Sequence, residues 1–152
     1  MLSFTFDNQF TAQLPGDSET GSRQRQFSHS LFARVRPKAA PQPELIHFSK
    51  EVATLLGLNE EQCHSEEFVQ VFSGTKVLPG MDPHATCYGG HQFGNWAGQL
   101  GDGRAINLGE INTARGHLML QLKGAGPTPF SRSADGLAVL RSSLREYLCS
   151  EA

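Results

Sequence analysis

Three separated groups of residues have the types and the order needed to hold a phosphorylated ligand. The first is the run Gly101–Arg104, with the sequence GDGR, which stands between two apolar stretches and whose Asp-Gly pair predicts a hairpin turn. The second is Lys123, which ends an alternating segment whose leucines occupy the opposite face of a predicted strand. The third is Glu146, which lies further on in a predicted amphipathic helix.

A glycine turn, a strand lysine and a helix glutamate in this order match the ATP-binding lobe of protein kinases. In such a lobe the glycine backbone approaches the phosphates, the lysine neutralises their charge, and the glutamate orients the lysine through an ion pair. Because phosphate transfer depends mainly on charge stabilisation, Arg104 is expected to be a further phosphate ligand. We therefore predict a Lys123–Glu146 ion pair in the intact protein. Taken singly, an ordinary turn, a solvated lysine and a surface glutamate are the alternatives.

Other functional motifs fit the sequence less well. No GxxxxGK[ST] loop is present, and GDGRAI lacks the third glycine of a dinucleotide-binding fingerprint and does not open a helix. His84 and Cys87 have the spacing of a zinc-ligand pair, but no second pair follows, so a zinc site is not expected. We interpret His91 as a hydrogen-bonded structural histidine among aromatic residues, and Cys149 as a core residue.

The elements around these residues predict an α+β fold. Residues 1–44 are expected to form an irregular extension with one short strand. Residues 45–80 are expected to form two short packing helices, with Ser49 as an N-cap and a capping box that begins at Asn59. Residues 81–152 are expected to form an antiparallel sheet with a glycine-rich hairpin, followed by the helix that carries the glutamate. This last part corresponds to a truncated kinase-like N-lobe without its C-lobe.

The predicted terminal helix covers residues 137–152. Its apolar residues recur at helical spacing: Leu137, Leu140, Leu144, Tyr147 and Leu148. It reaches Ala152 with no glycine, asparagine or proline to stop it, although helices usually end with such a signal. We therefore expect that the chain continues in the native protein.

A loose basic run precedes the helical part, and prolines make it extended. Its cations are Arg23, Arg25, Arg34, Arg36 and Lys38. We interpret these residues as a solvated loop, and a dedicated anion site is the alternative.

The composition is that of a globular protein, with no sign of nucleic acid or a membrane as a partner. Hydrophobic residues make up 38% and charged residues 18% of the chain, so it is globular rather than disordered. A net charge of -2 gives no argument for nucleic acid or an anionic membrane as a partner, and no apolar run is long enough to span a bilayer. Three cysteines without CxxC spacing and an N-terminus without a basic signal segment indicate the cytoplasm.

Most of the chain after Ser30 resembles one known family, the selenoprotein-O-like protein adenylyltransferases. The matching segments are RVRPKAAPQPELIHFSKEVATLLGL, YGGHQFGNWAGQLGDGRAINLGE and LQLKGAGPTPFSRSADGLAVLRSSLREYLCSEA. Within them, GHQFG, GQLGDGR and LKGAGPTP are the distinctive motifs. The resemblance implies a protein-kinase-like fold that binds ATP in a flipped orientation. It also implies transfer of AMP, rather than phosphate, to hydroxyl side chains of proteins.

The resemblance also assigns roles to individual residues. It implies nucleotide contacts from Gly101, Gly103 and Arg104, and it makes Lys123 the strand lysine of the family and Glu146 its helix partner. It adds one further nucleotide-binding pair in the loop before the helix, which consists of Asp135 and Gly136.

Other family residues are absent from this stretch. Phe130 stands where the family often has tyrosine, which removes a hydroxyl and affects none of the contacts named above. The catalytic aspartate and the ligands for Mg²⁺ or Mn²⁺ are expected beyond Ala152. No catalytic or metal-binding residue is therefore expected here, and the fragment alone is expected to have no transferase activity.

The residues leave two other functions open. A phosphotransferase of the same fold would use the same N-lobe parts and differ only in the phosphorus that is attacked. A non-catalytic module that binds ATP would keep the site and lack the transfer step. The partners expected of the adenylyltransferase are ATP and protein substrates, with no nucleic acid and no membrane.

Overall fold

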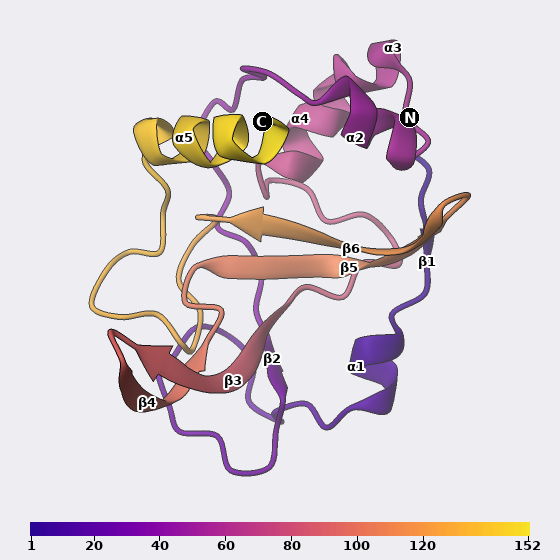
Figure 1. Ribbon diagram of the computed structural model, residues 1–152. Helices are drawn as coiled ribbons and strands as arrows, with labels where there is room; N and C mark the ends of the chain where they lie inside the picture. Colours follow the sequence, from indigo (N-terminus) through magenta and orange to yellow (C-terminus); the bar gives the residue numbers. More distant parts are fainter.

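A six-stranded antiparallel sheet forms the centre of the computed structural model, which describes residues 1–152 (Figure 1). Four strands lie in the order β1-β5-β3-β2, while β4 pairs with β3 and β6 pairs with β5. The strands are β1 (Thr5–Phe6), β2 (Phe32–Arg34), β3 (His84–Gln92), β4 (Asn95–Gly101), β5 (Ala105–Thr113) and β6 (Gly116–Lys123). The predicted α+β class and antiparallel sheet are confirmed.

Short helices between residues 50 and 72 pack against the buried leucines of the β5–β6 ribbon. The helices are α1 (Gln9–Gln13), α2 (Lys50–Leu55), α3 (Glu60–Cys63), α4 (Glu66–Phe72) and α5 (Leu140–Glu151). Leu56 and Phe72 pack both against the apolar cluster of the helices and against the buried leucines of β5 and β6, so the two clusters form a continuous core. None of the helices is long and apolar enough to cross a bilayer.

The helix starts follow the local sequence signals. Ser49 accepts a hydrogen bond from the N–H of Val52, and Asn59 and Gln62 form the reciprocal capping box that the sequence predicted. The number of helices was wrong, because there are three between residues 45 and 80. Ser65 accepts from the N–H of Phe68 and thereby starts α4 directly after α3 has ended.

The N-terminal 44 residues are more ordered than the sequence pattern indicated. They contain α1 and β2 in addition to the predicted strand, and β1 and β2 are strands of the central sheet. Phe32 and Ala33 of β2 are almost completely buried against β3. Pairing with distant strands therefore decides the structure of a segment that has no strong propensity of its own.

The glycine-rich hairpin is present, but its turn is not at Gly101–Arg104. β3 and β4 form the hairpin, and Gln92 pairs with Asn95 across a two-residue turn. The turn residues Phe93 and Gly94 both have positive φ, at 52° and 81°, which matches the twist of paired strands. The GDGR run instead connects β4 to β5, and these two strands do not pair with each other.

The terminal helix begins later than predicted and is not buried. Leu137 forms a bridge with Ala125, so α5 starts only at Leu140. No residue of α5 is buried, and Cys149 is exposed, so its interpretation as a core residue was wrong. Figure 1 shows α5 above β6, on the same side as α4.

Candidate functional site

A cleft of about 760 Å³ opens beside the β3–β4 hairpin. Its walls come from residues 24–26, from side chains of β3 and β4, from the β4–β5 connection and from the loop 129–136. Four of the predicted site residues line it directly: Gly101, Gly103, Arg104 and Gly136. The cleft has the size of a pocket for a small molecule.

Asp102 fastens the β4–β5 connection to the sheet. Its N–H donates to the carbonyl of Thr86 at 2.9 Å, and its carboxylate accepts from the N–H of Thr86 at 2.9 Å. Asn107 of β5 donates to the same carboxylate at 3.4 Å. The Asp102 carboxylate is therefore hydrogen-bonded to other groups of the protein, and the backbone of the neighbouring glycines faces the cleft.

Glycine is required at Gly101 because of a close neighbour. A Cβ atom at this position would lie 2.4 Å from the ring of Phe130, and φ is 151°. The ring of Phe130 thus packs directly on the backbone of the connection. Its partner on the other side is Phe27, with ring centroids 4.8 Å apart.

Lys123, Glu146 and Arg104 form one charged cluster at the edge of the cleft. The Nζ of Lys123 lies 3.0 Å from Glu146 Oε2, and a guanidinium nitrogen of Arg104 lies 3.7 Å from Glu146 Oε1. The predicted Lys123–Glu146 ion pair is therefore present. All three side chains are about half exposed, so the cluster contributes little to stability and its cations remain accessible.

The pKa of Glu146 reflects both cations. The hydrogen bond from Lys123 is the largest cause that holds the pKa of this carboxyl below its ordinary value, and the charges of Lys123 and Arg104 add to it. Glu146 is therefore ionised at neutral pH and shares one negative charge between two cations. The cluster as a whole keeps an excess of positive charge next to the glycine backbone.

Tyr88 belongs to the same neighbourhood, although sequence reasoning did not single it out. It lies on β3 opposite Leu100 and lines the cleft. Burial and the charge of Asp102 raise the pKa of its phenol, while Lys123 opposes this shift. Its hydroxyl is therefore neutral at physiological pH and provides a polar group within the cleft.

Asp135 and Gly136 fold the loop back onto the end of β6. Asp135 Oδ1 accepts from the N–H of Leu137 at 3.0 Å, and Gly136 has a φ of 71°. A Cβ atom on Gly136 would lie 2.3 Å from the backbone of Gly126, so only glycine fits there. Asp135 itself does not line the cleft, and neither do Lys123 and Glu146.

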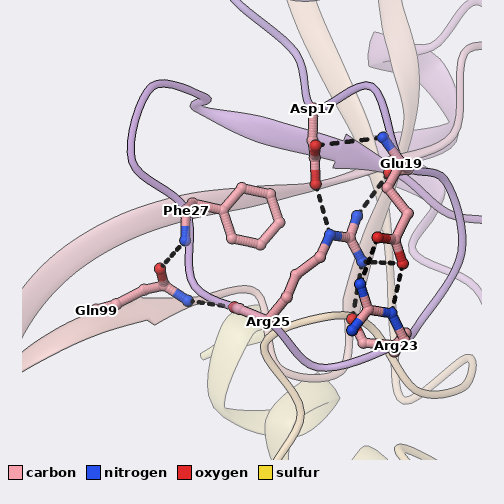
Figure 2. Close-up of polar contacts among 6 residues, drawn as sticks. All are labelled: Asp17, Glu19, Arg23, Arg25, Phe27 and Gln99. Atoms are coloured by element: carbon pink, nitrogen blue, oxygen red, sulfur yellow. Dashed lines mark hydrogen bonds and ion pairs between the residues drawn. The ribbon is translucent and has the colours of Figure 1, made fainter.

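A network of ion pairs and hydrogen bonds holds the N-terminal wall of the cleft (Figure 2). Arg25 is 10% exposed, lies 2.5 Å from Asp17, and donates to the carbonyl of Glu19 at 2.6 Å. Burial alone would raise the pKa of Asp17, but the hydrogen bond from Arg25 lowers it below its ordinary value. The side chain of Gln99 on β4 accepts a hydrogen bond from the N–H of Phe27 and donates one to the carbonyl of Arg25.

The interpretation of the basic run as a solvated loop was therefore wrong for Arg25, whereas Arg34 is solvated but lies in strand β2 rather than in a loop. Arg25 is paired and largely buried, and Arg34 donates two hydrogen bonds to Asp82, at 2.8 and 2.9 Å. The carboxylate partners lie far away in the sequence or outside the run, so the basic pattern alone did not reveal them.

The histidines do not form a metal site. No group of three or more His, Cys, Asp or Glu side chains is arranged to hold a metal ion. His84 is buried between Phe10 and Phe32, and its Nδ1 contacts the carbonyl of Asp82. His91 lies edge-on to Trp96 as expected, but it is exposed, so the expected structural role of a buried, hydrogen-bonded ring does not apply.

Comparison with known proteins gives the class of protein first. The chain is similar over its whole length to proteins named protein nucleotidyltransferase YdiU, with 57% identity in Flavobacterium johnsoniae and 59% in Azoarcus sp.. A third relative of the same name, from Rhodopirellula baltica, is 60% identical over 99% of this chain. All three relatives are thus named as protein nucleotidyltransferases.

A separate comparison, with protein families, gives the family of the chain. The family described as "Protein adenylyltransferase SelO" matches residues 18–152, and the chain belongs to it. The chain covers 29%, 30% and 28% of the three relatives, so it spans less than a third of their length.

Proposed function

We propose that this chain is the ATP-binding N-terminal part of a protein adenylyltransferase that transfers AMP from ATP to Ser, Thr or Tyr hydroxyls of proteins. The membership in the SelO family and the names of the relatives support nucleotidyl transfer as the reaction. In this proposal the sheet and α5 act as a kinase-like N-lobe, and the protein works in the cytoplasm. Its three free cysteines fit that compartment.

The observation that carries the proposal is the cluster of Lys123, Glu146 and Arg104 beside the glycine backbone. Lys123 and Arg104 contact the phosphates, because they are accessible cations at the edge of the cleft. Glu146 orients both cations, and Gly101 and Gly103 let the ligand approach the backbone closely. Phosphates with several negative charges gain most from such a cluster.

Asp135 and Gly136 complete the proposed nucleotide contacts. Gly136 lines the cleft, and Asp135 closes the loop that presents it. The second oxygen of the Asp135 carboxylate, Oδ2, makes no hydrogen bond within the chain. This oxygen is an acceptor for a ribose or base donor of the ligand.

The residues present fit ATP but not a metal ion on their own. The cleft volume, the accessible cations and the glycine backbone suit a nucleotide triphosphate. Mg²⁺ or Mn²⁺ prefers several oxygen ligands, and this chain arranges no such group. We therefore propose that the metal ligands and the catalytic aspartate come from the remainder of the protein. When bound, the metal ion would neutralise phosphate charge.

The proposed reaction cleaves ATP between its α-phosphorus and its β-phosphate. The hydroxyl oxygen of the protein substrate forms a bond to this phosphorus, the bond to the β-phosphate oxygen breaks, and pyrophosphate leaves with the electron pair. The hydroxyl proton passes to a base outside this chain. Lys123 and Arg104 act by holding the phosphate chain in place, since phosphate transfer depends mainly on positioning and charge.

Mass spectrometry of a hydroxyl-bearing acceptor protein tests the proposal. The complete protein is incubated with ATP, a divalent metal and the acceptor, and we expect an AMP adduct. A phosphate adduct would replace the proposal with a phosphotransferase of the same fold. Tight ATP binding without any adduct would indicate a non-catalytic module.

The isolated chain provides a second test. We propose that residues 1–152 alone have no activity, because no metal-ligand group is present in them. AMP transfer by the purified fragment, retained through successive purification steps, would contradict this part of the proposal.

A further inference from the structure

Two buried hydroxyl groups hold the β4–β5 connection. Thr128 is completely buried, and its Oγ1 donates to the carbonyl of Asp102 at 2.6 Å. Ser131 is 9% exposed, and its Oγ donates to the carbonyl of Gly103. Each hydroxyl also accepts a backbone N–H of its own turn, from Phe130 at 3.2 Å for Thr128 and from Thr128 at 2.8 Å for Ser131. Both hydroxyls are therefore fixed in orientation.

The geometry of the peptide bond transmits this orientation to two N–H groups. In a trans peptide the carbonyl oxygen and the next N–H point in opposite directions, and the chain has no cis peptide. The hydrogen bond to the carbonyl of Asp102 thus fixes the direction of the N–H of Gly103. The hydrogen bond to the carbonyl of Gly103 fixes the N–H of Arg104 in the same way. Both N–H groups point away from the buried turn, and neither has an acceptor within the protein.

These N–H groups lie where an anion would meet them. Gly103 and Arg104 both line the cleft, and the guanidinium of Arg104 belongs to the charged cluster at its edge. Successive backbone N–H groups that point the same way form a concave site for anions. A site that is already ordered before the ligand arrives loses less entropy on binding.

We infer that Thr128 and Ser131 are positioning residues that preform a phosphate site from the N–H groups of Gly103 and Arg104. The inference rests on the proposed function, because the anion is the phosphate chain of ATP. Without either hydroxyl, the freed carbonyl loses its partner and the peptide can rotate. A rotated peptide directs a carbonyl oxygen toward the phosphates and repels them.

The test compares variants of the complete protein by calorimetric titration with ATP and Mg²⁺. We expect Thr128→Val and Ser131→Ala to raise the Kd for ATP by about tenfold or more, and Thr128→Ser to restore it to within about threefold. Thr11→Val is the matched control, because Thr11 is also a buried threonine that donates to a carbonyl, that of Asn8, and it lies outside the cleft. The control should keep the wild-type Kd.

The outcomes separate the inference from the proposed function. An unchanged Kd in folded Thr128→Val and Ser131→Ala overturns the inference and leaves the proposed function standing. Failure of the wild type to bind ATP overturns the proposed function. If the variants do not fold, hydrogen–deuterium exchange of the wild type decides: saturating ATP should slow exchange at the amides of Gly103 and Arg104, and unchanged exchange overturns the inference.

Discussion

The helical end of the molecule and the cleft end are stabilised by different kinds of contact. Around α2–α4, Cys63 and Val71 are completely buried and the helix starts are capped by neighbouring side chains. At the cleft, α5 buries no residue, and its contacts include the ion pair between the half-exposed side chains of Lys123 and Glu146. The first end supplies stability, and the second leaves its polar groups available to a ligand. Substitutions at the two ends should therefore separate stability from ATP binding.

The largest expected effect is on stability at the helical end. Leu58 is 7% exposed and belongs to the apolar cluster of the helices. Leu58→Ala should lower the free energy of unfolding by about 2–5 kcal/mol, through lost burial and the cavity left behind. Urea unfolding of the complete protein measures this, and ATP affinity under folding conditions should stay unchanged. A large change in ATP affinity with little change in stability would show that the two ends are not separate.

Lys123→Ala should have the largest effect at the cleft end. A charge-assisted contact contributes about 1.5–3 kcal/mol, so AMP transfer by the complete protein should fall at least about tenfold. The unfolding free energy should change by less than about 0.5 kcal/mol, because this exposed lysine supports little packing. Lys50→Ala is the matched control, since Lys50 forms an exposed ion pair with Glu60 away from the cleft. Wild-type turnover in Lys123→Ala would remove the core of the nucleotide-site proposal.

Arg104→Ala should act in the same direction but less strongly. Its guanidinium lies 3.7 Å from Glu146, against 3.0 Å for Lys123, and the backbone N–H groups beside it would remain. The KM for ATP of the complete protein measures the loss. A loss greater than that of Lys123→Ala would make Arg104 the main phosphate ligand and reverse the proposed ranking.

The smallest effect concerns the protonation of Glu146. Its pKa is lowered in the folded protein, so the ion pair stabilises the fold above the ordinary pKa of 4.5 and is lost as the pH falls through the lowered value. The pair is therefore intact at neutral pH and breaks only in acid. A titration of the carboxyl carbon by NMR should give a higher pKa in Lys123→Ala than in the wild type. An equal pKa in both proteins would show that Lys123 is not the main cause.

Local signals in the sequence predicted local structure well. Ser49 and Asn59 cap helices through partners three residues away, and such contacts can be derived from spacing alone. The Lys123–Glu146 pair was also predictable, although it joins a strand to a helix. Its prediction depended on two clear periodic patterns, one at the end of β6 and one along α5.

Contacts between distant segments were not predictable in the same way. The sequence placed a hairpin turn at Gly101–Arg104, whereas the pairing of β4 with β3 moves the turn to Phe93–Gly94. The roles of Thr128 and Ser131 depend on carbonyl groups more than twenty residues earlier, and no pattern of residue types shows which carbonyl a hydroxyl will reach. Cys149 looked like a core residue because helical spacing indicates an apolar face but not whether another element covers it.

The N-terminal strands pair with strands that come much later in the sequence, and this sets the order in which the chain can fold during its synthesis. β1 pairs only with β5, whose partner residues are Ile111 and Asn112, and β2 pairs with β3. At a translation rate of about 5–20 residues per second, the first strand leaves the ribosome roughly 5–20 s before its partner exists. During that interval the phenylalanines near the N-terminus lack the apolar side chains against which they pack in the folded protein. The nascent chain is therefore exposed to chaperones and to aggregation until β5 has emerged.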